Sequence, residues 1–182
     1  MADGEFSRES PVGRVYSASI IQKYADAKCF AEAFSAADAW VDESIALLFG
    51  TVFSQVSPSI IARRLLQSGK GSTSLSMLYA MRDFIVASPI FADDGFREKF
   101  KKALHQAESF KSWRNLVVHN YGYRKLAIQR QHRSADVYRQ YLGDEQKFNE
   151  ESERILNLHL SEGISCVKLL QELYQDAVRL QK

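Results

Sequence analysis

Apolar residues recur at steps of three and four positions along most of the chain, the spacing that one buried face of an α-helix requires. From residue 16 to residue 49 the pattern is nearly unbroken, so this segment is either two helices or one kinked helix. A break near Ser109 would divide another of the helical segments in two. The same spacing predicts helices over residues 58–66, 75–88, 96–121 and 145–180.

Turn-forming residues separate these segments. Ser57 and Pro58 are typical of a helix start, because serine caps free backbone N–H groups and proline fits the first helical position. Gly122 is well placed to end the helix 96–121. Residues 67–73 read as a loop, and the polar, basic residues 123–142 as a loop with a short helix at 134–141. No alternating run of the strand type is present in the sequence.

The pattern therefore predicts an all-α fold, a bundle of about five or six helices. We expect residues 16–182 to form one domain and residues 1–15, which include Pro11 and Gly13, to be a flexible lead-in. A chain of 182 residues is long enough to bury one core, and its 46% apolar and 25% charged residues are ordinary for a soluble protein.

Charge is distributed unevenly along the chain. The formal net charge is only +2, which excludes a strongly basic, histone-like protein. Residues 111–142, however, hold seven basic and one acidic residue, a net charge of +6, whereas residues 1–50 and 143–182 are net acidic. Such a segment can attract phosphate, or it can be a solvated face paired with the acidic ends of the same chain. Charge alone leaves both interpretations open.

Several classes of protein are not indicated. The first residues lack the basic and apolar regions of a signal peptide, and no apolar run is long enough for a membrane span, so we expect a cytoplasmic protein without membrane contact. Cys29 and Cys166 lie in helical apolar patterns and are expected to be reduced, buried thiols. No phosphate-binding loop, serine-hydrolase elbow or metal-ligand spacing is present, so no metal and no cofactor are expected.

One segment of the basic region, residues 110–121, combines side chains that can do chemistry. On a helix at about 100° per residue, its large apolar side chains share one side. Lys111, Arg114, Asn115 and His119 share the other, and Asn115 and His119, four residues apart, can touch.

These residue types suit cleavage of RNA by its own 2′-hydroxyl. Neutral histidine can take up a proton near pH 7, so His119 would remove or return one. Arginine keeps its charge and contacts phosphate oxygens in pairs, so Arg114 would stabilise the negative charge that develops at phosphorus. Asn115 can orient the imidazole or a phosphate oxygen. No metal is needed for this chemistry.

The order Arg114-Asn115-x-x-x-His119-x-Tyr121 resembles the R-x-x-x-x-H motif of HEPN domains, and specifically the R-N-x-x-x-H-x-Y form of HepT-like toxins. The resemblance implies a helical bundle that dimerises and brings two motifs to a shared cleft. It also implies a metal-independent endoribonuclease of a bacterial toxin–antitoxin, abortive-infection or CRISPR system, with Arg114, Asn115 and His119 as catalytic residues. Tyr121 would line the site or be adenylylated by a nucleotidyltransferase antitoxin, which would be a separate chain.

The resemblance is confined to residues 105–124, and the basic insert at 123–142 departs from compact HepT-like proteins. The basic residues Lys111, Arg124, Lys125, Arg130 and Arg133 are candidates for RNA binding, with tyrosines among them for stacking; the alternative is a basic loop packed on acidic helices. A second match to the spacing, Arg154 to His159, lacks the polar residue and the tyrosine, and is expected to be ordinary helix surface.

Three hypotheses remain from the sequence. The first is a dimeric, metal-independent HEPN endoribonuclease. The second is a HEPN-like bundle that binds RNA or a protein partner without cutting. The third is a helical regulatory protein in which the motif arises by chance.

Overall fold

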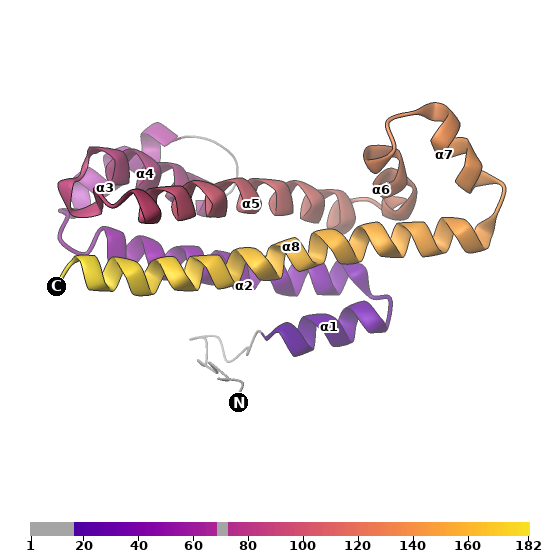
Figure 1. Ribbon diagram of the computed structural model, residues 1–182, viewed down its shortest axis with the longest axis horizontal. Helices are drawn as coiled ribbons and strands as arrows, with labels where there is room; N and C mark the ends of the chain where they lie inside the picture. The colour runs from indigo at the N-terminus through magenta and orange to yellow at the C-terminus, as the bar shows by residue number, and fades with distance from the viewer. Residues whose placement is uncertain (1–16, 69–72) are drawn as a thin grey trace.

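The computed structural model describes residues 17–68 and 73–182, and in these residues it is all-α, with no strand. The predicted lead-in at 1–15 and residues 69–72 of the predicted loop lie outside the described residues. The helices are α1 (Ala18–Asp26), α2 (Phe30–Val52), α3 (Pro58–Ser68), α4 (Thr73–Ala87), α5 (Asp94–His119), α6 (Tyr123–Gln131), α7 (Ala135–Leu142) and α8 (Glu145–Leu180), with a short 3-10 helix at Pro89–Phe91 (Figure 1).

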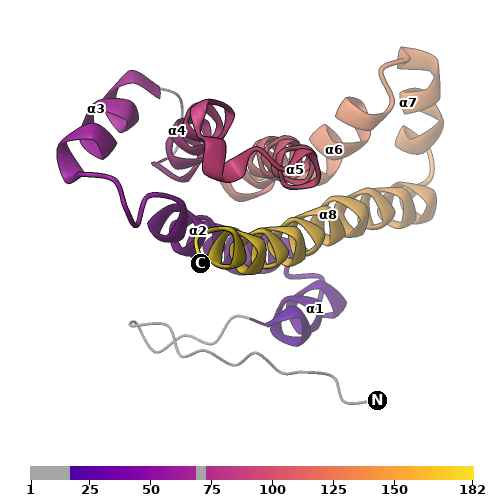
Figure 2. The same ribbon diagram turned by 60° about the vertical axis from the view of Figure 1, so that its left-hand side comes forward.

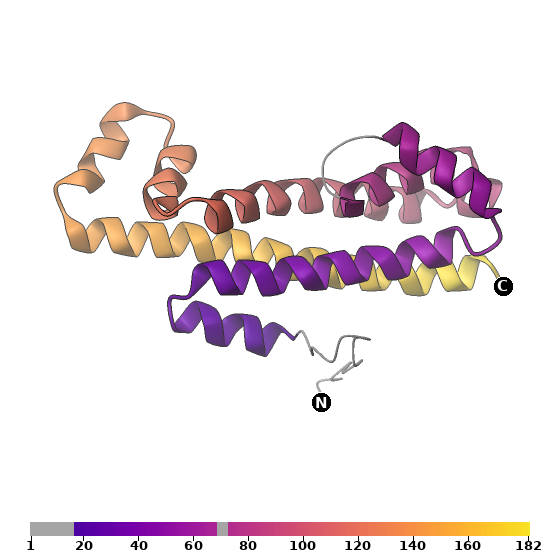
Figure 3. The ribbon, with the colours of Figure 1, turned by 180° about the vertical axis from the view of Figure 1, so that it is seen from behind.

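Three long helices, α2, α5 and α8, form the body of the bundle and pack on one another (Figures 1 and 3). Helices α2 and α8 run in the same direction and α5 runs in the opposite one. Helices α3 and α4 lie at the end where α5 begins, and α6 and α7 lie at the end where it finishes. Helix α1 lies on the side of α2 that faces away from α4 and α5 (Figure 2).

Short side chains set the starts of three helices. Ser17, Asp93 and Asp144 each accept a hydrogen bond from the backbone N–H three residues ahead, at the first turns of α1, α5 and α8. This capping satisfies N–H groups that no helical partner reaches. Between α1 and α2 the backbone turns at Lys28, which has a left-handed φ of 60°. The segment 16–49 is therefore two helices, the first of the two forms that the sequence allowed.

The all-α prediction is confirmed, but the expected number of helices was too low, since eight α-helices lie in the described part of the chain. Helix α5 is continuous through Ser109, so the break considered there is absent. Gly122 does not end α5; it is the N-cap of α6, and α5 ends at His119 with Asn120 as its C-cap. Residues 123–142 fold into α6 and α7; the short helix predicted at 134–141 is α7, whereas α6 takes the place of the expected loop, because its polar composition concealed it.

Phe110 of α5 is the packing centre that joins the three long helices. Its ring is fully buried and stacks on Phe34 of α2, with ring centroids 5.7 Å apart. On its other side lies Gly163 of α8, where an added Cβ would stand 2.5 Å from the ring. Helix α8 can approach α5 this closely because Gly163 has no side chain.

The two cysteines differ in their surroundings. Cys166 is buried as expected, and burial raises the pKa of its thiol to about 12, so it stays protonated and unreactive. The expectation that Cys29 is also buried was wrong: it is exposed at the start of α2, where the chain turns. Among the described residues, no helix combines the length and the apolar character that crossing a membrane would require.

We predict that Gly163→Ala destabilises the protein. The new methyl group would overlap the Phe110 ring, and overpacking of a core costs about 1–3 kcal/mol, against about 1 kcal/mol gained from helix propensity. Gly50→Ala is the matched control, because Gly50 is also helical and has nothing within 4 Å of an added Cβ, so this variant should be slightly more stable. Thermal unfolding of both variants measures the difference; a Gly163→Ala protein as stable as Gly50→Ala would contradict the packing.

Candidate functional site

Helix α5 and α2 together build the site, at the last two turns of α5. Arg114 Nη1 donates to Asn115 Oδ1 at 3.1 Å and contacts His119 Nε2 at 3.0 Å. Asn115 and His119 are exposed and Arg114 is partly so. The structure thus brings the three expected catalytic residues into direct contact, at a position that a substrate can reach.

The contact between Arg114 and His119 joins a guanidinium nitrogen to the ring nitrogen Nε2. A guanidinium group has only N–H donors, so Nε2 is the acceptor in this contact, an assignment made from the hydrogen-bond geometry. A ring nitrogen that accepts has the electron pair that a general base uses.

Lys111 does not lie at the open surface with Asn115 and His119, as the helical projection had predicted. Its side chain is only 8% exposed and forms ion pairs with Asp38 and Asp42 of α2. Helix α2 covers this edge of α5, so the ammonium group is neutralised by two carboxylates inside the bundle. In this position Lys111 does not present a positive charge to the open surface.

Asp38 is the site residue that the sequence analysis missed. Its carboxylate Oδ2 lies 3.0 Å from Arg114 Nε, and its side chain is 13% exposed. The N–H of Arg114 Nε is buried and does not point along this contact, so charge and not an aligned hydrogen bond holds the pair. The signal in the sequence was a pair of aspartates four residues apart, Asp38 and Asp42, beside the buried positions Ala37 and Val41 of α2.

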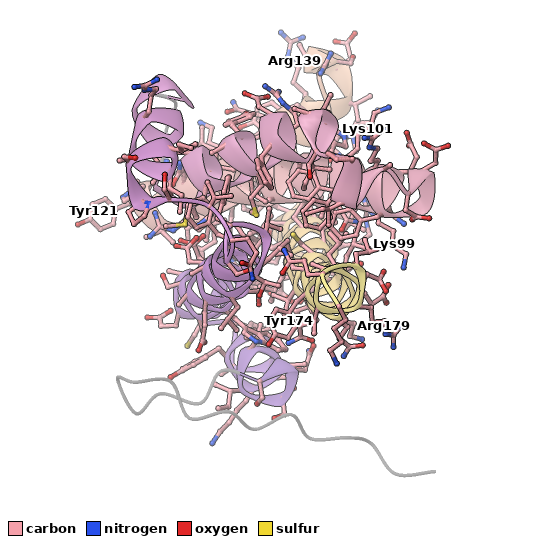
Figure 4. The ribbon with its side chains drawn as sticks, turned by 90° about the vertical axis from the view of Figure 1, so that its left-hand side faces the viewer. Lys99, Lys101, Tyr121, Arg139, Tyr174 and Arg179 are labelled. Atoms are coloured by element: carbon pink, nitrogen blue, oxygen red, sulfur yellow. The ribbon has the colours of Figure 1, made fainter. Side chains whose placement is uncertain are left out.

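Tyr121 follows directly after α5 and is fully exposed, at 109% of its reference area. Figure 4 shows its side chain projecting outward from the bundle. A continued helix would place this residue near Arg114, but α5 ends at His119, before Tyr121. Its hydroxyl is therefore open to solvent beside the motif.

The basic residues of α6 divide into two groups. Arg124 pairs with Glu153 of α8 at 3.2 Å and lies over the Phe30 ring, so its charge is used inside the fold. Arg130 is exposed but held in place, because its guanidinium covers the Trp113 ring at 4.4 Å and donates to Ser112 Oγ at 2.9 Å.

Lys125 and Arg133, the other two candidates, are exposed. Two of the proposed RNA-binding residues, Lys111 and Arg124, are thus paired with carboxylates, as the alternative interpretation of the basic segment expected. The remaining three, Lys125, Arg130 and Arg133, present positive charge at the surface of α6 and just after it.

The second match to the motif spacing forms no comparable arrangement. Arg154 pairs with Glu151 on its own helix at 2.7 Å. His159 is buried, stacks on the Trp113 ring with centroids 3.8 Å apart, and contacts Glu162 through Nδ1 at 2.8 Å. Arg154 is surface, as expected, whereas His159 is part of the packing between α8 and α5.

In the residues that the structure describes, no group of three or more His, Cys, Asp or Glu side chains is arranged to hold a metal ion. Comparison with protein-family models, with curated proteins and with solved structures gave no match. Function is therefore inferred from the geometry of the chain itself.

We predict that Glu151, which joins His132 of α6–α7 to Arg154 of α8, stabilises the protein in a pH-dependent way. The Arg154 guanidinium, with His132 contributing, lowers the pKa of the Glu151 carboxyl from 4.5 to about 2. A folded-state pKa below the unfolded one stabilises the fold above pH 4.5, and this is lost as the pH falls toward 2.

Glu151→Gln should therefore lower the melting temperature at pH 7, with a gap to wild type that narrows below pH 4.5. Glu98→Gln is the control, because Glu98 is exposed and its Lys101 partner is 3.9 Å away, so it should change little at any pH. Melting curves at pH 7, 5 and 3 test this; a gap for Glu151→Gln that stays constant with pH would rule it out.

Proposed function

We propose that the chain is a HEPN-type, metal-independent endoribonuclease that cleaves RNA through attack of the 2′-hydroxyl on the adjacent phosphate. The observation that carries the proposal is the 3.0 Å contact between Arg114 Nη1 and His119 Nε2. A permanent cation and an imidazole at this separation can act on the same phosphodiester.

The chemical steps can be assigned to the two side chains. His119 Nε2 removes the proton of the 2′-hydroxyl, and the 2′-oxygen forms a bond to phosphorus. Arg114 stabilises the negative charge on the phosphorane oxygens, and Asn115 orients the guanidinium or a phosphate oxygen. The bond from phosphorus to the 5′-oxygen breaks, and that oxygen takes up a proton, which leaves a 2′,3′-cyclic phosphate and a 5′-hydroxyl.

A composite site in a homodimer would supply both proton transfers. One His119 would act as the base, and its copy in the second protomer, in the protonated imidazolium form, as the acid that gives its proton to the leaving 5′-oxygen. In the single chain, Arg114 already occupies His119 Nε2. Binding of a phosphate would draw Arg114 away from Nε2 and free it for the proton of the 2′-hydroxyl.

The biological setting that the motif favours is a toxin of a bacterial toxin–antitoxin or abortive-infection system. The full exposure of Tyr121 supports a modification or site-lining role, since a nucleotidyltransferase antitoxin, a separate chain, would need an accessible hydroxyl. Cleavage would then be controlled by a residue two positions after His119.

A HEPN-like bundle that binds RNA or a protein without cutting is the second candidate, and one observation favours it. Asp38 and Asp42 offset the charges of Lys111 and Arg114, so the cluster around the motif is close to neutral. A neutral cluster attracts a phosphate less strongly than two free cations do.

We predict that the protein cleaves single-stranded RNA in the presence of EDTA and leaves 2′,3′-cyclic phosphate ends. Arg114→Ala and His119→Ala should each reduce the rate by about 10²- to 10⁴-fold, because general acid–base catalysis and charge stabilisation have this size. Arg154→Ala, from the second match, should cleave like wild type. The same His119→Ala change should relieve any toxicity of expression.

The two candidate functions give different results in that assay. Wild-type protein that binds RNA with unchanged ends, in EDTA and in magnesium, would support the binding bundle and refute the nuclease. A monomer in sedimentation that retains full activity would refute the composite site.

We also predict that Arg130 is a phosphate contact. In the non-cleaving His119→Ala protein, Arg130→Ala should weaken RNA binding and reduce the slope of log affinity against log salt by about 1, the value for one lost phosphate contact. Arg179→Ala is the control, because Arg179 is also a surface arginine but belongs to the last turn of α8, next to the C-terminus, which lies at the end of the bundle away from α6 (Figure 1). Equal slopes for the two variants would exclude Arg130 from the RNA path.

A further inference from the structure

The geometry points to Asp38 of α2 as the positioning residue of the Arg114 guanidinium, without which Arg114 does not act on the phosphate. This inference rests on the proposed nuclease function and adds to it a residue from another helix. Asp38 contributes a carboxylate oxygen 3.0 Å from Arg114 Nε, whereas a different nitrogen of the guanidinium, Nη1, meets His119.

The planar shape of a guanidinium group links the contact at Nε to the terminal nitrogens. Asp38 attracts the Nε edge by charge, without an aligned hydrogen bond, and because the group is rigid, holding this edge near α2 also limits where the terminal nitrogens can lie. Arg114 Nη1 then points at Asn115 Oδ1 and His119 Nε2, at 3.1 and 3.0 Å. Without a partner at Nε the long arginine side chain would occupy several rotamers, and the three-residue arrangement would form only part of the time.

Lys111 fixes Asp38 in turn. The Lys111 ammonium lies beside Asp38 Oδ1, so the carboxylate stands between two cations, one deep in the bundle and one at its surface. A buried ammonium needs a carboxylate partner, because an unpaired charge there would be very costly. This requirement keeps Asp38 directed toward α5, where its second oxygen meets Arg114.

A comparison with Asp42 distinguishes a positioning role of Asp38 from a merely structural one. It pairs with Lys111 as Asp38 does, on the same helix one turn later, but its described contacts do not include Arg114, and its side chain is 45% exposed. If the only task of the carboxylates were to neutralise Lys111, the two aspartates would be equivalent. The contact with Arg114 is what distinguishes Asp38.

The experiment compares Asp38→Asn with Asp42→Asn, two changes that remove the same charge from neighbouring turns of α2. The quantities measured are cleavage of a short single-stranded RNA and binding of its 2′-O-methyl form, which cannot be cut. Asp38→Asn should reduce kcat by about 10- to 100-fold and leave the affinity for the 2′-O-methyl RNA within about threefold, since misplacement of a catalytic group costs rate rather than binding. Asp42→Asn should keep kcat within about threefold of wild type.

A second variant distinguishes the loss of a positioning contact from a loss of folding. Asp38→Asn combined with Lys111→Met removes the buried ammonium together with the carboxylate, and Asp42 can be left unpaired because it is half exposed. This protein should melt near the wild-type temperature and still show the reduced kcat. Recovery of full kcat in the double variant would overturn the inference, because the loss in Asp38→Asn would then come from Lys111 and the fold.

An NMR readout decides the question even if no RNA is cut. The order parameter of the Arg114 Nε–Hε group should be that of a rigid group in wild type and in Asp42→Asn, and should fall below about 0.6 in Asp38→Asn. Absence of cleavage by wild type would refute the nuclease function while this measurement still tests the Asp38 contact. An unchanged order parameter in Asp38→Asn, or equal kcat values for the two aspartate variants, would refute the positioning role.

Discussion

The close packing of Phe110 between Phe34 of α2 and Gly163 of α8 is the constraint on which the site depends. The missing side chain at Gly163 lets α8 and α5 approach each other. The stacked rings of Phe34 and Phe110 fix the position of α2 relative to α5 along the helix axes. Asp38 follows Phe34 by one turn of α2, Arg114 follows Phe110 by one turn of the antiparallel α5, and the two side chains meet at 3.0 Å. An ion pair of this kind is weak as a source of fold stability, whereas buried aromatic packing is strong. The packing therefore positions the charges, and the charges position the guanidinium.

Burial of Lys111 has a consequence for how an RNA would be attracted. Its charge is matched by Asp38 and Asp42, and Arg114 shares Asp38, so the charges at the base of the site nearly cancel. Attraction for a phosphate backbone would then come from neighbouring cations. The exposed Arg130, fixed over Trp113 and bonded to Ser112 on α5, is the best placed of these, because Ser112 lies on the same face of α5 as Asn115 and His119. The site and the attraction of the substrate would thus depend on different residues.

The bounds of a helix could be predicted where a continuous apolar stripe and a capping residue indicate the same start. Helix α8 begins at Glu145 and ends at Leu180, as its periodicity indicated, because Asp144 caps a long stripe that packs on two other helices. Helix α7 was predicted as the short helix at 134–141, but α6 was not foreseen, since its sequence is mostly polar and it is stabilised by contacts such as Arg124 with Glu153. The spacing predicted that Arg114, Asn115 and His119 share one side of the helix, but not that Arg114 contacts His119. The meeting with Asp38 and the burial of Lys111 could not be predicted either, because a helical projection gives the direction of a side chain but not what covers it.

The two copies of the arginine–histidine spacing show why a motif needs its surroundings. Residues five apart on a helix differ in direction by about 140°, so an arginine and a histidine at this spacing do not meet by default. In α8 they separate, with Arg154 toward Glu151 and His159 buried on Trp113. In α5 they meet, because His119 is the last helical residue and the flexible Arg114 reaches along the exposed side toward it. What distinguishes the two arginines is a carboxylate from a different helix: Asp38 lies at the Nε of Arg114, whereas the partner of Arg154 belongs to its own helix. The tertiary contact, and not the spacing, is what makes one copy a candidate site.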